Sequence, residues 1–122
     1  MSKKTNYIKG TFNCAETIID AFNKNNDAHI PVAIGSGMGT GLTVGSVCGA
    51  VNAAVMIIGF TKGRECYSDE NQAKELTSKL LKSIKDEYGS EICIDLKKTG
   101  VSCNDIIEFS YIKLEEILNI KG

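Results

Sequence analysis

An uncharged stretch from residue 30 to residue 61 constrains the fold more than any other part of the chain. Its second half, residues 46–60, is small and apolar, which is typical of a helix that is buried on most of its surface. Its first half is rich in glycine, which tolerates positive φ and allows close backbone approach; the glycines are Gly35, Gly37, Gly39, Gly41 and Gly45. We therefore expect a glycine-rich loop that leads into a buried central helix.

A membrane-spanning helix is the alternative interpretation of this stretch, and such a helix needs about 20 consecutive apolar residues. Its most apolar part, residues 47–60, is shorter than this and is interrupted by Asn52. The glycine-rich half does not suit a lipid-exposed helix. The segment that follows Met1 is polar and lacks the apolar core of a secretory signal. We therefore expect no stable membrane insertion and a cytoplasmic location.

The length of 122 residues suits one helical domain spanning residues 1–122. The formal net charge of −1 provides no overall basic field to attract nucleic acid. The chain has no Trp, four Tyr and four Phe, and therefore few aromatic side chains on which bases could stack. Nucleic acid is not an expected partner.

Capping residues and apolar spacing predict helices on both sides of the central one. Asn13 and Glu16 form a variant of the capping box, so the first helix should begin after Asn13 and end before the polar run 23–27. Further helices are expected at 31–34, from 68 or 69 to 88 with Gly89 following, from 90 to 96, and after the N-cap Ser102. The chain should therefore be an all-α, single-domain bundle of about five helices.

Four of the five cysteines fall in the first turn of a different predicted helix: Cys14, Cys48, Cys93 and Cys103. A helix N-terminus has unpaired N–H groups and a partial positive charge, which favour a thiolate over a thiol. The thiolate is both the nucleophilic and the metal-binding form of cysteine, and several cysteines in a cytosolic chain indicate redox or metal chemistry. These four are therefore the candidate catalytic and metal-ligating residues, and Cys66 is expected to lie elsewhere.

Among these thiols, Cys48 is expected to be the most acidic. Ser46 is the predicted N-cap of the central helix, which places Cys48 at the second helical position beside the amides of the glycine-rich loop. No carboxylate lies near Cys48 in the sequence, whereas Cys14, Cys93 and Cys103 each have Asp or Glu within two residues. If the helix starts gather at one end of the bundle, all four thiols should line one site.

The cysteine-bearing segments resemble the family of redox-active proteins named for its C_GCAxxG_C_C pattern. The resemblance rests on residues 13–16 (NCAE), on the glycine-rich entry into residues 48–50 (CGA), and on the later Cys93 and Cys103. It implies redox activity, with Cys14, Cys48, Cys93 and Cys103 as the four characteristic cysteines, and fixes no cofactor or substrate. The last glycine of the CGAxxG motif is Ala53 here, and Cys66 matches no cysteine of the family.

Several interpretations of the chemistry stay open. The glycine-rich loop lacks the spacing of a dinucleotide-binding motif or a P-loop, but its N–H groups and Gly49 could bind an anion as cofactor. There is no C-x-x-C for a zinc knuckle, although four cysteines from four helix starts could ligate an iron–sulfur cluster or another metal. Two of them could instead exchange a disulfide. The alternatives to a redox protein are an anion- or nucleotide-binding helical module and a purely structural helical protein.

The expected partner is a redox protein or a small-molecule electron donor or acceptor. The sequence leaves open whether the protein is an oxidoreductase or an electron carrier, and whether it forms a homo-oligomer. The lone His29 is expected in a partly exposed loop rather than in a metal site.

Overall fold

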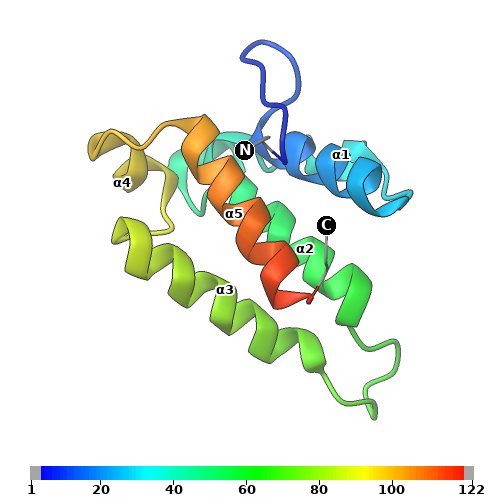
Figure 1. The fold of residues 1–122 in the computed structure, drawn as a ribbon. Helices are drawn as coiled ribbons and strands as arrows, with labels where there is room; N and C mark the ends of the chain where they lie inside the picture. Colours follow the sequence, from blue (N-terminus) through cyan, green and yellow to red (C-terminus); the bar gives the residue numbers. More distant parts are fainter. Residues whose placement is uncertain (1–3, 120–122) are drawn as a thin grey trace.

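Five α-helices make up the computed structural model, which describes residues 4–119. They are α1 (Cys14–Asn26), α2 (Gly49–Lys62), α3 (Gln72–Tyr88), α4 (Cys93–Lys98) and α5 (Cys103–Ile117) (Figure 1). The glycine-rich loop contains a short 3-10 helix, η1 (Val32–Gly35), and an irregular turn, η2 (Gly41–Gly45). Within residues 4–119 the structure has no β-strand. The predicted all-α, single-domain bundle is confirmed.

Helix α2 is the central element of the bundle. It packs against α1, α3 and α5, and Figure 1 shows it behind α5, between α1 and α3. Small side chains near its start, Ala50, Ala53 and Ala54, are fully buried and allow neighbouring helices to approach closely. Farther along, Ile57 and Ile58 are also fully buried, and each contributes about 1.5–3 kcal/mol of transfer free energy. None of the helices in the described part of the chain is both long and apolar enough to span a membrane.

The bounds of α2 differ from those expected. The helix begins at Gly49, with Cys48 as its N-cap, whereas Ser46 was the expected cap. It continues past Gly59 to Lys62, and Phe60, expected within the buried stretch, is 61% exposed. The later start has a non-local cause, because Ser46 and the residue after it pair with a distant segment of the chain.

That pairing is an isolated antiparallel bridge between Val47 and Ile92. The N–H of Cys48 donates to the carbonyl of Glu91 at 2.8 Å, and the N–H of Cys93 donates to the carbonyl of Ser46 at 2.7 Å. The two bonds hold residues 46–48 in an extended conformation and place the start of α2 beside the start of α4. Two cysteines are thereby brought to one end of the bundle.

Helix α1 begins at the predicted capping box. The side chain of Asn13 accepts from the N–H of Glu16 at 2.8 Å, and the side chain of Glu16 accepts from the N–H of Asn13 at 2.8 Å. The helix extends to Asn26, beyond the expected end, because the polar residues of its last turn have partners in the folded chain. Asn23, for example, bonds to both the N–H and the carbonyl of Ile30.

The remaining helices follow their predicted signals with small shifts. Gly89 ends α3 with a positive φ of 81°, as expected, although α3 begins only at Gln72. Ser102 caps α5 through the N–H of Asp105, which places Cys103 at the first helical position as predicted. The helix expected at 90–96 begins later, at Cys93, and the helix expected at 31–34 is η1.

Candidate functional site

A pocket of about 100 Å3 lies where α1, α2, α4 and α5 begin. Four cysteines line it, together with polar and apolar side chains from several elements; the lining residues are Tyr7, Asn13, Cys14, Thr40, Cys48, Gly49, Cys93, Leu96, Lys97, Val101, Cys103 and Ile106. Cys66 is not among them and lies exposed in the connection between α2 and α3. The expected gathering of four cysteines, with the fifth outside, is seen in the structure.

Each of the four pocket cysteines stands at the start of a helix. Cys14, Cys93 and Cys103 are the first residues of α1, α4 and α5, and Cys48 is the N-cap of α2. Their exposure differs: Cys48 and Cys93 are buried, Cys14 is half-buried, and Cys103 is exposed. All four are free thiols. A reagent entering from solvent therefore meets Cys14 and Cys103 before it meets the two buried sulfurs.

Cys14 and Cys48 are neighbours in the pocket, where Gly49, the residue after Cys48, lies against the sulfur of Cys14. Interaction with the Cys48 thiol is the largest cause that lowers the pKa of Cys14 to about 6, against the opposing effect of burial. Backbone N–H groups of Thr40, Ala15 and Ala50 lower the pKa of Cys14 further. The thiolate of Cys14 thus lies at the N-termini of two helices at once, its own α1 and the neighbouring α2.

The prediction that Cys48 is the most acidic thiol is wrong. The hydrogen bond to Cys14 and burial both raise the pKa of Cys48, and they outweigh the N–H groups of Val51 and Ala50, which lower it. Cys48 keeps its proton because that proton is shared with the neighbouring thiolate. Of the two neighbours, the acidic thiol is Cys14, although Glu16 lies only two residues away in the sequence.

Gly49 allows the sulfur of Cys14 to reach the start of α2. A Cβ atom at residue 49 would lie 2.6 Å from the sulfur of Cys14 and 2.6 Å from the carbonyl oxygen of Met38. Both approaches are well inside van der Waals contact, so a side chain here would displace the sulfur or the loop. The glycine of the CGA segment is therefore required for the cysteine pair.

The glycine-rich loop supports the site through its backbone. Thr40, whose N–H points to the sulfur of Cys14, has a φ of 52°, and the next residues, Gly41, Leu42 and Thr43, also have positive φ. At Gly41 a Cβ would lie 2.7 Å from the Cβ of Cys93. The left-handed turn is thus packed between the first and third pocket cysteines.

Of the six glycines expected to contact a cofactor, Gly49 alone lines the pocket. Gly35, Gly37, Gly39, Gly41 and Gly45 lie in the loop that leads to it. Cofactor binding by these glycines stays a prediction.

Tyr7 is a site residue that the sequence analysis missed. It lines the pocket with Cys14 and Cys103. Burial raises the pKa of Tyr7, and the charge and hydrogen bond of Cys103 and the charge of Cys14 raise it further. Its hydroxyl therefore stays protonated and able to donate beside both sulfurs. No local signal marks Tyr7 in the sequence, because it precedes the first helix and belongs to no motif.

Metal ligation requires several donor side chains to point at one position. Within residues 4–119, no group of three or more His, Cys, Asp or Glu side chains is arranged to hold a metal ion. The four cysteines line one pocket but, as they lie here, do not form a four-thiolate site of the kind that holds zinc or an iron–sulfur cluster. Metal ligation by Cys14, Cys48, Cys93 and Cys103 stays a prediction without support from the geometry.

The fold and the pocket define a small all-helical thiol protein, with an acidic cysteine beside a buried one. The chain belongs to the family described as "Putative redox-active protein (C_GCAxxG_C_C)", whose model matches residues 12–117. The match spans all four pocket cysteines, so the resemblance noted from the sequence is confirmed. No curated protein and no solved structure matches the chain.

Proposed function

We propose that the protein is a thiol–disulfide redox protein in which Cys14 is the nucleophile and Cys48 is the resolving cysteine. The observation that carries this proposal is the position of the Cys14 sulfur against Gly49 at the start of α2, beside the Cys48 thiol, whose interaction lowers the pKa of Cys14 to about 6. At neutral pH Cys14 is then mostly thiolate, which is the form that attacks disulfides. Cys14 is also the more accessible of the two sulfurs.

The reaction transfers two electrons from the cysteine pair to a disulfide. The thiolate of Cys14 attacks one sulfur of the substrate disulfide, forming a mixed disulfide and releasing the other sulfur as a thiolate that takes a proton from solvent. Cys48 then gives up its proton, and its sulfur attacks that of Cys14. A Cys14–Cys48 disulfide forms, and the second substrate sulfur leaves as a thiolate and is protonated. A dithiol donor reverses these steps and restores the reduced pair.

The pKa of Cys48 suits its place in this sequence. The largest cause that raises the pKa of Cys48 is its hydrogen bond to Cys14. Once Cys14 is in a mixed disulfide, its negative charge is gone and that cause is removed. Cys48 can then ionise beside the bond that it must attack. The pair therefore keeps Cys48 protonated until the first exchange has taken place.

The proposed substrates are disulfides of a partner protein or of a small molecule, in the cytoplasm. The support for a thiol mechanism over a metal-cluster mechanism is the geometry, which pairs two cysteines and does not group three donors within residues 4–119. A metal-cluster electron carrier would differ from such a thiol protein in its absorption spectrum and its iron content. Anaerobically purified protein would show cluster absorption bands and bound iron, whereas the proposed thiol protein is colourless and free of iron.

The test is to trap the two steps by mass spectrometry. Reduced protein treated with oxidised glutathione should lose two hydrogens and yield a peptide joined through Cys14 and Cys48. The variant Cys48→Ala should stop at a mixed disulfide of Cys14 with glutathione, and Cys14→Ala should form neither product at this pair. Cys66→Ala is the matched control and should behave as the unmodified chain. A disulfide that joins other cysteines while Cys14 and Cys48 stay reduced would overturn the proposal.

A further inference from the structure

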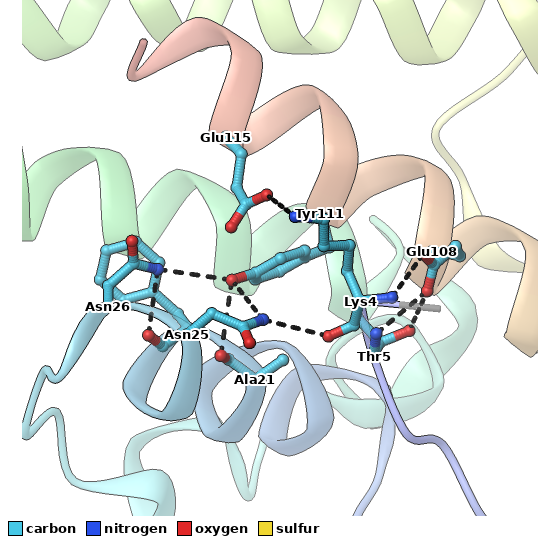
Figure 2. A network of polar contacts seen from close by, with 9 residues as sticks. Lys4, Thr5, Ala21, Asn25, Asn26, Glu108, Tyr111 and Glu115 are labelled. Carbon is cyan, nitrogen blue, oxygen red and sulfur yellow. Dashed lines mark hydrogen bonds and ion pairs between the residues drawn. The ribbon is translucent and has the colours of Figure 1, made fainter. Parts of the chain in front are cut away.

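The N-terminal segment is attached to the bundle by polar side chains rather than by regular secondary structure. Figure 2 shows Lys4 and Thr5 facing Glu108 of α5. The carboxylate of Glu108 accepts from the N–H of Lys4 at 2.8 Å, from the N–H of Thr5 at 3.1 Å, and from the hydroxyl of Thr5. One half-buried carboxylate thus accounts for three of the bonds that fix this segment.

Two further contacts join the same segment to α1 and α5. The amide of Asn25 donates to the carbonyl of Lys4 at 3.2 Å, and the ammonium of Lys4 lies 3.6 Å from the carboxylate of Glu115 (Figure 2). Asn25 also donates to the hydroxyl of Tyr111, which links α1 to α5 behind the segment. The anchored residues therefore have a fixed position relative to both helices.

Tyr7 follows this anchor by two residues and reaches the thiol pocket. Its half-buried ring packs against the hydrophobic core and lines the pocket beside Cys14 at the start of α1. Cys103, at the start of α5, lines the same pocket. The side chain therefore extends between the two pocket cysteines that are not fully buried.

We propose that Tyr7 is a specificity-determining residue that covers Cys14 and limits the thiol pocket to small or flexible disulfides, and that Glu108 is the positioning residue that holds Tyr7 there. The pocket that Tyr7 lines measures about 100 Å3, which leaves little space beside the ring, so we expect a rigid substrate to reach Cys14 only when the ring moves aside. Glu108 accepts three of the hydrogen bonds that hold this segment, so loss of its carboxylate should loosen the segment while the contacts of Lys4 with Asn25 and Glu115 remain. This inference rests on the proposed function for its substrate class, while the accessibility of Cys14 is measured independently of it.

The experiment compares the alkylation of Cys14 by a small reagent, iodoacetamide, and by a bulky one, a polyethylene glycol maleimide, in the reduced protein. The readout is the ratio of the two rate constants, followed by mass spectrometry of the Cys14 peptide. Tyr7→Ala should raise the relative rate of the bulky reagent by about tenfold, equivalent to about 1.4 kcal/mol in the opening of the cover. Tyr7→Phe keeps the ring and loses only the hydroxyl, so its increase should be smaller.

Glu108→Gln should change the ratio in the same direction as Tyr7→Ala, although its side chain lies outside the pocket lining. Tyr67→Ala is the matched control, because Tyr67 is 90% exposed in the connection that carries Cys66. Circular dichroism establishes that each variant is folded. An unchanged ratio in folded Tyr7→Ala would overturn the role of Tyr7, and an unchanged ratio in Glu108→Gln would overturn that of its anchor. Neither result would bear on the proposed disulfide between Cys14 and Cys48, which is mapped separately by mass spectrometry.

Discussion

The Cα atom of Gly49 lies directly against the sulfur of Cys14, so that a Cβ at residue 49 would be 2.6 Å from that sulfur. The contact joins the first turn of α1 to the first turn of α2. It brings the amide of Ala50 to the sulfur of Cys14 and Cys48 to within hydrogen-bonding reach. The sulfur of Cys14 thus occupies the space that any other residue type at position 49 would fill with a side chain.

Gly49→Ala should therefore both destabilise the protein and disturb the cysteine pair. Overpacking of this kind typically costs about 1–3 kcal/mol, and here the carbonyl of Met38 also blocks the added methyl group. Urea denaturation of the reduced protein measures the loss of stability, and the alkylation of Cys14 as a function of pH measures the disturbance. Gly37→Ala is the control, because a Cβ at Gly37 would meet nothing within 4 Å. Equal stability of the two variants would contradict the packing argument.

Cys48→Ala should raise the pKa of Cys14. The variant removes the thiol whose hydrogen bond is the largest cause that lowers the pKa of Cys14 to about 6. The midpoint of Cys14 alkylation against pH should move from about 6 toward the value of about 8.5 of an ordinary cysteine. It should not reach that value, since the N–H groups of Thr40, Ala15 and Ala50 remain. A midpoint that stays near 6 would show that the backbone alone sets the acidity of Cys14.

The stability of the reduced protein should depend on pH through Cys14. Because the pKa of Cys14 is lower in the folded chain, about 6, than in the unfolded chain, about 8.5, ionisation of this thiol favours the folded state. Its contribution is fully present above pH ~8.5 and is lost as the pH falls through about 6. As the pH falls from about 8.5 to about 6, the unmodified chain should therefore lose unfolding free energy relative to Cys14→Ser. Urea titrations at several pH values, with a reductant present, measure it, and a difference independent of pH would refute the expectation.

Tyr111→Phe should destabilise the bundle without affecting the thiol pair. The ring of Tyr111 is fully buried, and its hydroxyl accepts from Asn25 at 3.0 Å and from Asn26 at 3.4 Å and donates to the carbonyl of Ala21 at 3.4 Å. Loss of the hydroxyl leaves these partners without their bonds and should cost about 1–2 kcal/mol. Thermal unfolding measures this, with the exposed Tyr67→Phe as the control. The midpoint of Cys14 alkylation should be the same in both variants.

The parts of the fold that the sequence predicted are those governed by local signals. The capping box of Asn13 and Glu16, the N-cap Ser102 and the terminal Gly89 each act within a few residues, and all three are found where expected. The gathering of four cysteines followed from their placement at helix starts. That placement required only the approximate helix boundaries that such signals provide.

The features that were missed depend on contacts between distant segments. The start of α2 is displaced to Gly49 because Val47 pairs with Ile92, which no local pattern reveals. The acidity of Cys14 arises partly from N–H groups of Thr40 and Ala50, which belong to another part of the chain. Tyr7 enters the site from a segment whose preceding residues are hydrogen-bonded to Glu108, more than 100 residues away in the sequence. In each case the deciding partner is known only once the fold is known.

The four pocket cysteines come from the starts of four separate helices, and this has a consequence during biosynthesis. In a chain that has not yet folded, the starts of α1 and α2 are not packed together. Cys14 then lacks the interaction with Cys48 that lowers its pKa. Its cysteines are then nearly equivalent toward an oxidant, and random cross-links compete with the native pair. Selective chemistry at Cys14 therefore requires α1 and α2 to be packed together, so the reactivity of the pair and its protection against wrong pairing arise together on folding.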